Sequence, residues 1–115
     1  MRFVCLVYHE QSVLDGMSEA EMRVCVDDSL AYDRELEERG HMVVAHALQP
    51  VGEARSVKMR KGQKHITDGP FAETKEQLIG FILIEAASRE EAVEIAAGIP
   101  MGRTGTIEVR PVMGL

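Results

Sequence analysis

The chain has 115 residues, the size of one ordinary domain, and 45% of them are apolar against 28% charged, which is typical of a globular protein. The net charge of −6 argues against a nucleic-acid partner, because phosphate binding needs a clustered basic surface. No apolar run approaches the ~20 residues that cross a bilayer, and no signal-peptide core opens the chain. We therefore expect one cytoplasmic domain over residues 1–115 with no membrane partner.

The first 50 residues predict a strand, a helix and a second strand. Residues 3–8 form an apolar run rich in β-forming side chains, which indicates a buried strand with two apolar faces. Ser18 and Glu21 have the spacing of a capping box, and Gly40 stands where a left-handed cap ends a helix. Residues 42–48 then predict a strand. The inward stripe of the helix should contain Met22, Cys25, Val26, Ser29, Tyr32 and Leu36.

The middle of the chain predicts a β-hairpin followed by turns. Residues 56–60 and 65–67 should form its two strands, joined by a turn over residues 61–64. Residues 68–70, Asp-Gly-Pro, are a further turn signal, and residues 74–77 have the pattern of a single helical turn.

The last third predicts a strand, a helix and a closing strand. Residues 79–85 are the strongest strand candidate, residues 88–98 form a helix that opens with a second Ser-x-x-Glu spacing, and residues 106–110 form the last strand. Along the first of these strands, Ile79, Phe81 and Leu83 should point to one face while Ile82 and Ile84 point to the other.

This order of elements is typical of an α+β domain with a ferredoxin-like antiparallel sheet and two helices on one face. The other face of the sheet would be left uncovered, although the two main strands are apolar there as well. Apolar surface of that extent normally meets a partner, so we expect a homodimer packed sheet to sheet. A small-molecule ligand would then fit a cavity between the sheet and the loops.

Residues 68–77 read DGPFAETKEQ, with Ala-Leu-Gln-Pro at 47–50 and Glu-Val-Arg-Pro at 108–111. Together these stretches resemble the DGPF-motif branch of the YCII-related proteins over nearly the whole chain. The resemblance implies a single ferredoxin-like domain of the dimeric α/β-barrel kind, usually a homodimer. The resemblance does not indicate a substrate, because the family has no established one. Members are often encoded near extracytoplasmic-function sigma factors. The wider group is suspected of cofactor-independent His/Asp enzymology, and that suspicion rests on fold-level analogy.

The candidate catalytic residues are His46, Asp68 and Glu73. Imidazole titrates near neutral pH, and partial desolvation beside a buried strand shifts the pKa of a carboxylate. The candidate ligand-binding residues around them are Gln49, Gly69, Pro70, Phe71, Lys75 and Arg110. The competing interpretation is structural: Gly69 permits an unusual backbone angle in a rigid turn, ion pairs lock the loop or the dimer, and a hydrogen bond satisfies His46.

Asp33 lies on the inward stripe of the first helix, where a carboxylate needs a partner, and Arg110 is a candidate for that partner.

A basic cluster surrounds Gly62 in the hairpin, and we interpret it as solvated or as protection for an exposed edge, with anion binding as the alternative. Its members are Lys58, Arg60, Lys61 and Lys64.

The remaining motifs point away from metal and cofactor chemistry. The histidines other than His46 show no ligand spacing, and the chain contains no phosphate-binding glycine loop and no Ser or Cys nucleophile motif. We therefore expect no metal and no cofactor. Cys5 and Cys25 lie in apolar patterns, so we expect free buried thiols.

Two functions remain open at this point. The first is a small-molecule enzyme that uses acid/base groups in a pocket near the dimer interface. The second is a non-catalytic ligand-binding or regulatory module, linked to a sigma-factor pathway, which accounts for the missing nucleophile and metal motifs.

Overall fold

A computed structural model describes residues 1–115 and contains three α-helices and six β-strands. In chain order the elements are β1 (Arg2–His9), α1 (Gln11–Asp15), α2 (Glu19–Glu38), β2 (Met42–Ala47), β3 (Arg55–Arg60), β4 (Gln63–Asp68), β5 (Gln77–Glu85), α3 (Arg89–Ala97) and β6 (Thr106–Pro111). Two short 3₁₀ turns lie at Val51–Glu53 and Pro100–Arg103. The predicted strands and both long helices are confirmed, whereas the short helix α1 was not predicted from the sequence.

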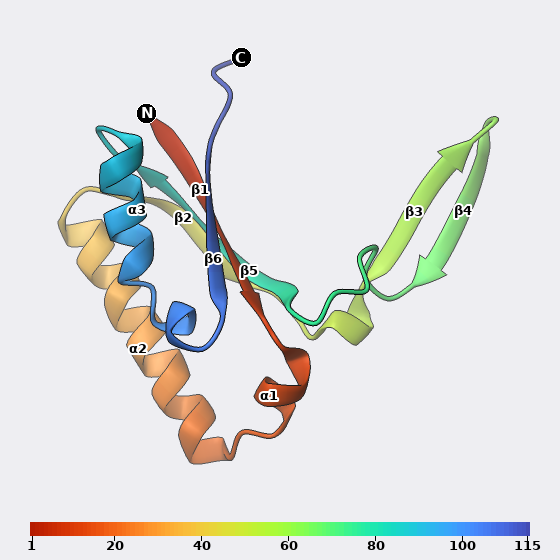
Figure 1. Ribbon diagram of the computed structural model, residues 1–115, viewed down its shortest axis with the longest axis horizontal. Helices are drawn as coiled ribbons and strands as arrows, with labels where there is room; N and C mark the ends of the chain where they lie inside the picture. Colours follow the sequence, from red (N-terminus) through yellow and green to blue (C-terminus); the bar gives the residue numbers. More distant parts are fainter.

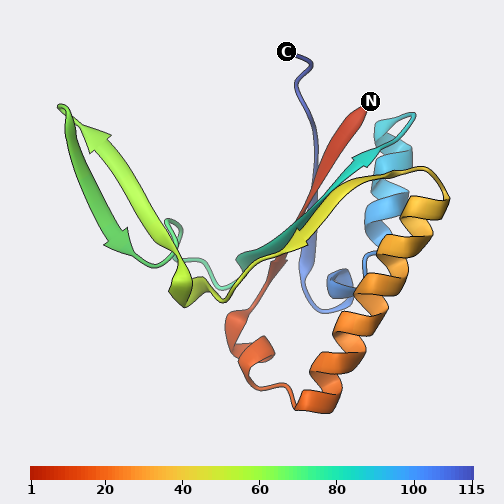
Figure 2. The same cartoon turned by 180° about the vertical axis from the view of Figure 1, so that it is seen from behind.

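Four strands form an antiparallel sheet in the order β2-β5-β1-β6, with α2 and α3 on one face (Figures 1 and 2). This arrangement is consistent with the ferredoxin-like fold. Strands β3 and β4 pair only with each other, as a separate two-stranded sheet. We call this hairpin the arm and the rest of the molecule the body.

The core lies between the sheet and the two long helices. Strand alternation turns Phe3, Cys5 and Val7 of β1 toward the helices, where Ile82 and Ile84 of β5 join them. These five side chains are at most 7% exposed. The helices supply Leu36, Ala92, Ile95 and Ala96 to the same cluster.

One side chain of β5 departs from the predicted alternation. The pairing of β1 with β5 shifts between Val7 and Tyr8, so that Gly80 opposes Val7 while Leu78 opposes Tyr8. Ile79 has no partner in this register and packs against the core cluster. The assignment of Ile79 to the face of Phe81 and Leu83 was therefore wrong, because a bulge breaks the two-residue period.

Helix α2 begins at the predicted capping box: the Ser18 hydroxyl accepts from the Glu21 amide, and the Glu21 carboxylate accepts from the Ser18 amide. Gly40 follows the helix with a φ of +78°. Leu36 is the only fully buried residue of α2, and Met22 and Val26 of the predicted inward stripe are exposed. The reason is visible in Figures 1 and 2: the first half of α2 diverges from the sheet. No helix is long and apolar enough to span a membrane.

Helix α3 follows the second predicted capping sequence in part. The Ser88 hydroxyl accepts from the Glu91 amide, as expected. The Glu91 carboxylate, however, accepts from the amide of Ala87 instead of that of Ser88. The helix therefore has the serine cap without the reciprocal bond of a complete capping box.

The arm has a tighter turn than the sequence predicted. Gln63 and Lys64 belong to β4, and the turn consists of Lys61 and Gly62, whose φ angles are +51° and +74°. Such a two-residue turn with two positive φ angles matches the twist of the hairpin strands.

Residues 69–76 connect the arm to β5 without the predicted helical turn. The Thr74 hydroxyl donates to the carbonyl of Glu76, and the side-chain amide of Gln77 donates to the carbonyls of Ala72 and Thr74. These side-chain bonds stabilise a bent loop instead of a helix, and Gln77 already begins β5.

Candidate functional site

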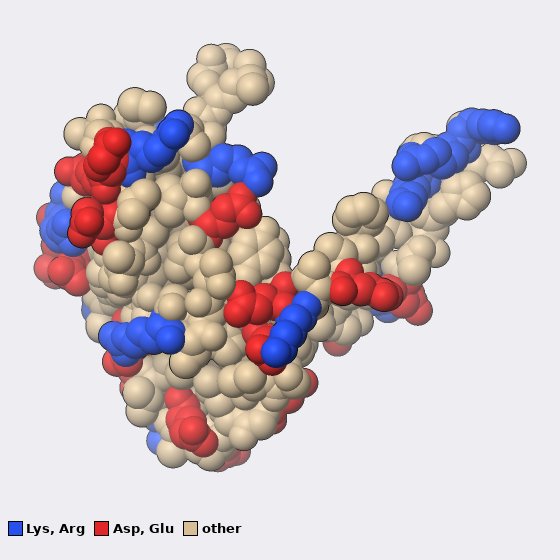
Figure 3. Space-filling view, viewed as in Figure 1, with Lys and Arg blue, Asp and Glu red and all other residues tan.

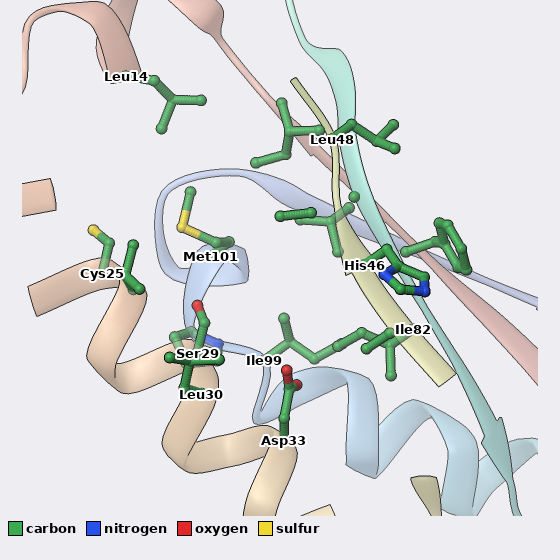
Figure 4. Close-up of a pocket in the computed structure, with 18 of the residues that line it drawn as sticks. Leu14, Cys25, Ser29, Leu30, Asp33, His46, Leu48, Ile82, Ile99 and Met101 are labelled. Carbon is green, nitrogen blue, oxygen red and sulfur yellow. The ribbon is translucent and has the colours of Figure 1, made fainter. Parts of the chain in front are cut away.

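The main cavity lies where α2 diverges from the sheet, and its volume is about 530 Å³. Of the 24 residues that line it, 15 are hydrophobic, so the site suits a mostly apolar molecule. Its walls come from α2, from β2 and β5, and from the turn after α3 (Figure 4). Labelled lining residues include Leu14, Leu30, Leu48, Ile99 and Met101.

Asp33 and Ser29 are the polar side chains that project from α2 into this cavity (Figure 4). Asp33 is half-buried and forms no hydrogen bond or ion pair with another residue. Burial raises the pKa of the Asp33 carboxyl above its usual 3.8, and the charge of Glu37 adds to the effect. The cavity therefore contains one carboxylate whose hydrogen-bonding capacity the protein leaves free.

Three other polar lining groups, Tyr32, Gln11 and Asp15, form hydrogen bonds within the protein. The Tyr32 hydroxyl donates to the carbonyl of Ile95 at 2.6 Å. The Gln11 amide donates to Asp15 at 2.8 Å, and its oxygen accepts from the Val51 amide. Asp33 on α2, with Ser29 beside it, has its hydrogen-bonding capacity available to a ligand.

His46 and Gln49 contribute to the cavity wall, but the His46 ring points away from the cavity. His46 pairs with Phe81 across β2 and β5, and their ring centroids lie 5.8 Å apart. Because Ala45 and Ala47 face the helices, alternation places the His46 ring on the opposite face of the sheet, which Figure 4 also shows.

Asp68, Gly69 and Pro70 lie at the root of the arm, outside the main cavity. Asp68 ends β4 and forms an ion pair with Arg55, 3.0 Å between Nε and Oδ1. Gly69 has a φ of +92°, which confirms the predicted unusual backbone angle. Its amide donates to the carbonyl of Ala54, and its carbonyl accepts from the Ser56 hydroxyl. This part of the DGPF motif therefore fastens the hairpin.

The rest of the motif is divided between the arm and the body. Phe71 is 78% exposed, and the Lys58 ammonium lies 5.4 Å from its ring centroid. Pro70 and Phe71 line a shallow groove along β3. Glu73 is exposed, whereas Lys75 reaches Glu10 at the end of β1, 3.5 Å between Nζ and Oε1.

Arg110 does not meet Asp33, contrary to the sequence-based expectation. Its guanidinium pairs with Glu108 on the same strand. Both side chains lie on the face of the sheet opposite the helices, since Val109 packs against the core. Asp33 is on the helix side, so the sheet separates the two residues.

The structure thus brings together only part of the predicted site. His46 and Gln49 border the main cavity, Pro70 and Phe71 border the arm groove, and neither of these two cavities contains members of both pairs. The sequence reasoning missed the role of Ser29 and Leu30 as cavity walls. The available signal was their position beside Asp33, a carboxylate on an otherwise apolar stripe.

No group of three or more His, Cys, Asp or Glu side chains is arranged to hold a metal ion. Both cysteines are free, and burial raises the pKa of the Cys5 thiol to about 11, which keeps it protonated and unreactive at neutral pH.

Comparison with known proteins places the chain in a family. It is 37% identical over 114 residues to an uncharacterised protein of Rhizobium meliloti (strain 1021), and the match covers 97% of this chain and 92% of that protein. The family model of the YCII-related domain matches residues 1–115. The chain therefore belongs to the YCII-related domain family.

Proposed function

We propose that this YCII-related protein binds a small molecule with an apolar body and one amine or other hydrogen-bond-donating group in the cavity between α2 and the sheet. The observation that carries the proposal is the half-buried Asp33 carboxylate, which faces an apolar cavity of about 530 Å³ without a protein partner. An ionised carboxylate accepts hydrogen bonds only, so a cationic or neutral donor complements it.

Thermal-shift and calorimetric screening with a series of aliphatic and aromatic amines tests this proposal. Matched alcohols and carboxylates of the same carbon skeleton serve as ligand controls. Amines should bind best, and Asp33→Asn should weaken that binding by roughly tenfold or more, because a charge-assisted bond is lost. Asp27→Asn, an exposed carboxylate on the same helix, should leave binding unchanged. Equal binding of amines by the wild type and Asp33→Asn would overturn the assignment.

We further propose that two copies pack through the open face of the sheet, in the dimeric α/β-barrel arrangement that the resemblance to the DGPF branch implies. The centre of that face is apolar, and its half-buried side chains are Val4, Leu6, Tyr8, Phe81 and Leu83. Its rim carries the ion pairs Arg2–Glu85 and Glu108–Arg110. An apolar centre with a polar rim is the usual composition of an interface.

Sedimentation tests this dimer. The wild type should sediment at about twice the chain mass of 12.7 kDa, and Leu83→Asp should shift the equilibrium to the single chain. Val93→Asp, on the exposed side of α3, is the control and should remain dimeric. A monomeric wild type, or an unaffected Leu83→Asp dimer, would refute the sheet-to-sheet arrangement.

A catalytic version of the proposal uses His46 as acid/base group with Asp68 and Glu73. Its support is that the backbone of His46 borders the cavity, while Asp68 at the end of β4 and Glu73 in the loop that follows are both exposed, where a second copy could reach them. Gln49, Gly69, Lys75 and Arg110 would then assist ligand binding. Turnover of a validated ligand that His46→Ala and Glu73→Gln both preserve would remove these catalytic roles. A validated ligand that the wild type binds but does not turn over would favour the binding or regulatory module, such as one in a sigma-factor pathway.

A further inference from the structure

The arm exposes an apolar face that nothing in its own chain covers. Val57, Met59 and Ile66 share one face of the hairpin, and they are 57%, 57% and 56% exposed. Strands β3 and β4 pack chiefly on each other, and the arm stands clear of the body in the space-filling view (Figure 3). An isolated two-stranded hairpin is at best marginally stable in water, so we expect the arm to pack against a partner.

The arm also carries a charge opposite to that of the body. Residues 55–68 contain five basic residues and one acidic residue, which leaves eight basic and eighteen acidic residues in the rest of the chain. Lys and Arg gather along the outer half of the arm in Figure 3. Helix α2 alone contains eight acidic and two basic residues. The same molecule therefore presents a basic, apolar arm and an acidic body.

The root of the arm is held firmly, although its faces are free. The Arg55–Asp68 ion pair and the two backbone-directed bonds of Gly69 join β3 to the loop that follows β4. Such a root limits the directions in which the hairpin can point, and preorganisation of this kind lowers the entropy cost of docking.

We propose that the arm is an intersubunit arm, which docks on the acidic body of a second copy of this chain and places the DGPF loop at that interface. The partner is a second copy because the arm is basic and the body is acidic, so one chain supplies both complementary surfaces. In a dimer with two-fold symmetry, the contact between arm and body then forms twice. The proposal rests on the dimerisation proposed above, because the arm needs a second copy to dock on, but not on the sheet-to-sheet contact itself. It also gives a reason why the main cavity, which His46 borders, contains neither Asp68 nor Phe71 of the same chain.

Intersubunit cross-linking tests the docking directly in the full-length protein. Met59 is replaced by the photoreactive amino acid p-benzoylphenylalanine, and isotope-labelled and unlabelled copies are mixed and allowed to exchange. The expected product joins position 59 of one copy to the body of the other, including acidic peptides of α2. Cross-links confined to one copy, or none at all while the wild type is dimeric, would overturn the proposal.

Point variants measure the energetic contribution. The double variant Val57→Ser/Ile66→Ser should raise the dimer dissociation constant by roughly tenfold or more, because it removes two apolar contacts. Lys58→Glu/Arg60→Glu should weaken the dimer most at low salt, where electrostatic attraction is least screened. Val93→Ser, a comparably exposed valine on α3, is the control and should have no effect.

The outcomes separate this proposal from the sheet-to-sheet dimer. A dimer that is sensitive to Leu83→Asp but indifferent to every arm variant overturns the arm alone. A dimer that is sensitive to the arm variants but not to Leu83→Asp overturns the sheet interface alone, and the arm then stands by itself. A strictly monomeric wild type whose arm binds a nucleic-acid probe through Lys58 and Arg60 overturns the second copy as the occupant.

Discussion

Ile82 and Ile66 both lie in antiparallel strands with antiparallel neighbours, yet their surroundings are opposite. Ile82 faces two helices and is 7% exposed, whereas Ile66 faces solvent and is 56% exposed. The body buries Ile82 within one chain, while the arm leaves the same kind of residue uncovered. The contrast teaches that strand patterning specifies a pleated surface and not the layer that covers it.

The largest expected effect breaks this contrast at the matched isoleucines. Ile82→Asp buries an unpaired charge in the core and should cost more than about 4 kcal/mol, enough to unfold a domain of ordinary stability. Ile66→Asp should change the free energy of unfolding of the body by no more than about 0.5 kcal/mol. Chemical denaturation followed by circular dichroism measures both. Similar losses would mean that the arm belongs to the same cooperative unit.

A smaller effect is expected at the junction of the two regions. Gly69→Ala forces a side chain into a positive-φ position and should weaken the root of the arm by about 1 kcal/mol or more. Hydrogen exchange should show faster exchange of the β3–β4 amides and unchanged protection in β1 and β5. Gly52→Ala, in a turn with a negative or extended backbone and open space, is the control. Uniform loss of protection would contradict the separation of arm and body.

Within the body, the exposed half of α2 depends on its cap because packing contributes little there. Ser18→Ala should lower the free energy of unfolding by about 1 kcal/mol, while Ser12→Ala on α1 should have little effect. The Ser18 backbone and side-chain bonds hold the pKa of Glu21 below its usual 4.5. The stabilisation by the ionised Glu21 carboxylate is present above pH 4.5 and should disappear as the pH falls through the lowered pKa. An unchanged melting temperature would show that the first turn is dispensable.

The smallest effect concerns the cavity side of the same helix. Because the pKa of Asp33 is raised on folding, the unfolded chain loses this proton first, and stability falls as the pH rises through the window above 3.8. Asp33→Asn should therefore stabilise the protein at neutral pH, by no more than about 0.5 kcal/mol for a partly exposed group. The gain should vanish below pH 3.8. A variant less stable than the wild type at pH 7 would reveal an unseen partner.

Much of the fold followed from local patterns. The capping serines, the apolar alternation of β5 and the glycine after α2 act within a few residues, so the sequence reveals them directly. The predictions that failed depend on segments far apart: the bulge that redirects Ile79, and the sheet that separates Asp33 from Arg110. The helical turn expected at 74–77 failed because side-chain bonds from Thr74 and Gln77 stabilise a bent loop.

The candidate site was predictable by residue type but not by place. The sequence identified Asp33 as an anomaly and the DGPF loop as rigid, and the structure gives the first a cavity and the second a role at the root of the arm. The sequence could not show that the His46 ring turns away from that cavity, since the direction of the ring depends on the register of β2 against β5.

By itself the sequence determined the order of strands and long helices, the caps of α2 and the apolar character of both faces of the sheet, because each is set by neighbours within one or two turns of chain. The tertiary structure decided that α2 splays from the sheet to leave a cavity, and that the hairpin projects as an arm. Both depend on how distant segments pair and pack, and burial is a property of those pairings and not of any single stretch of residues.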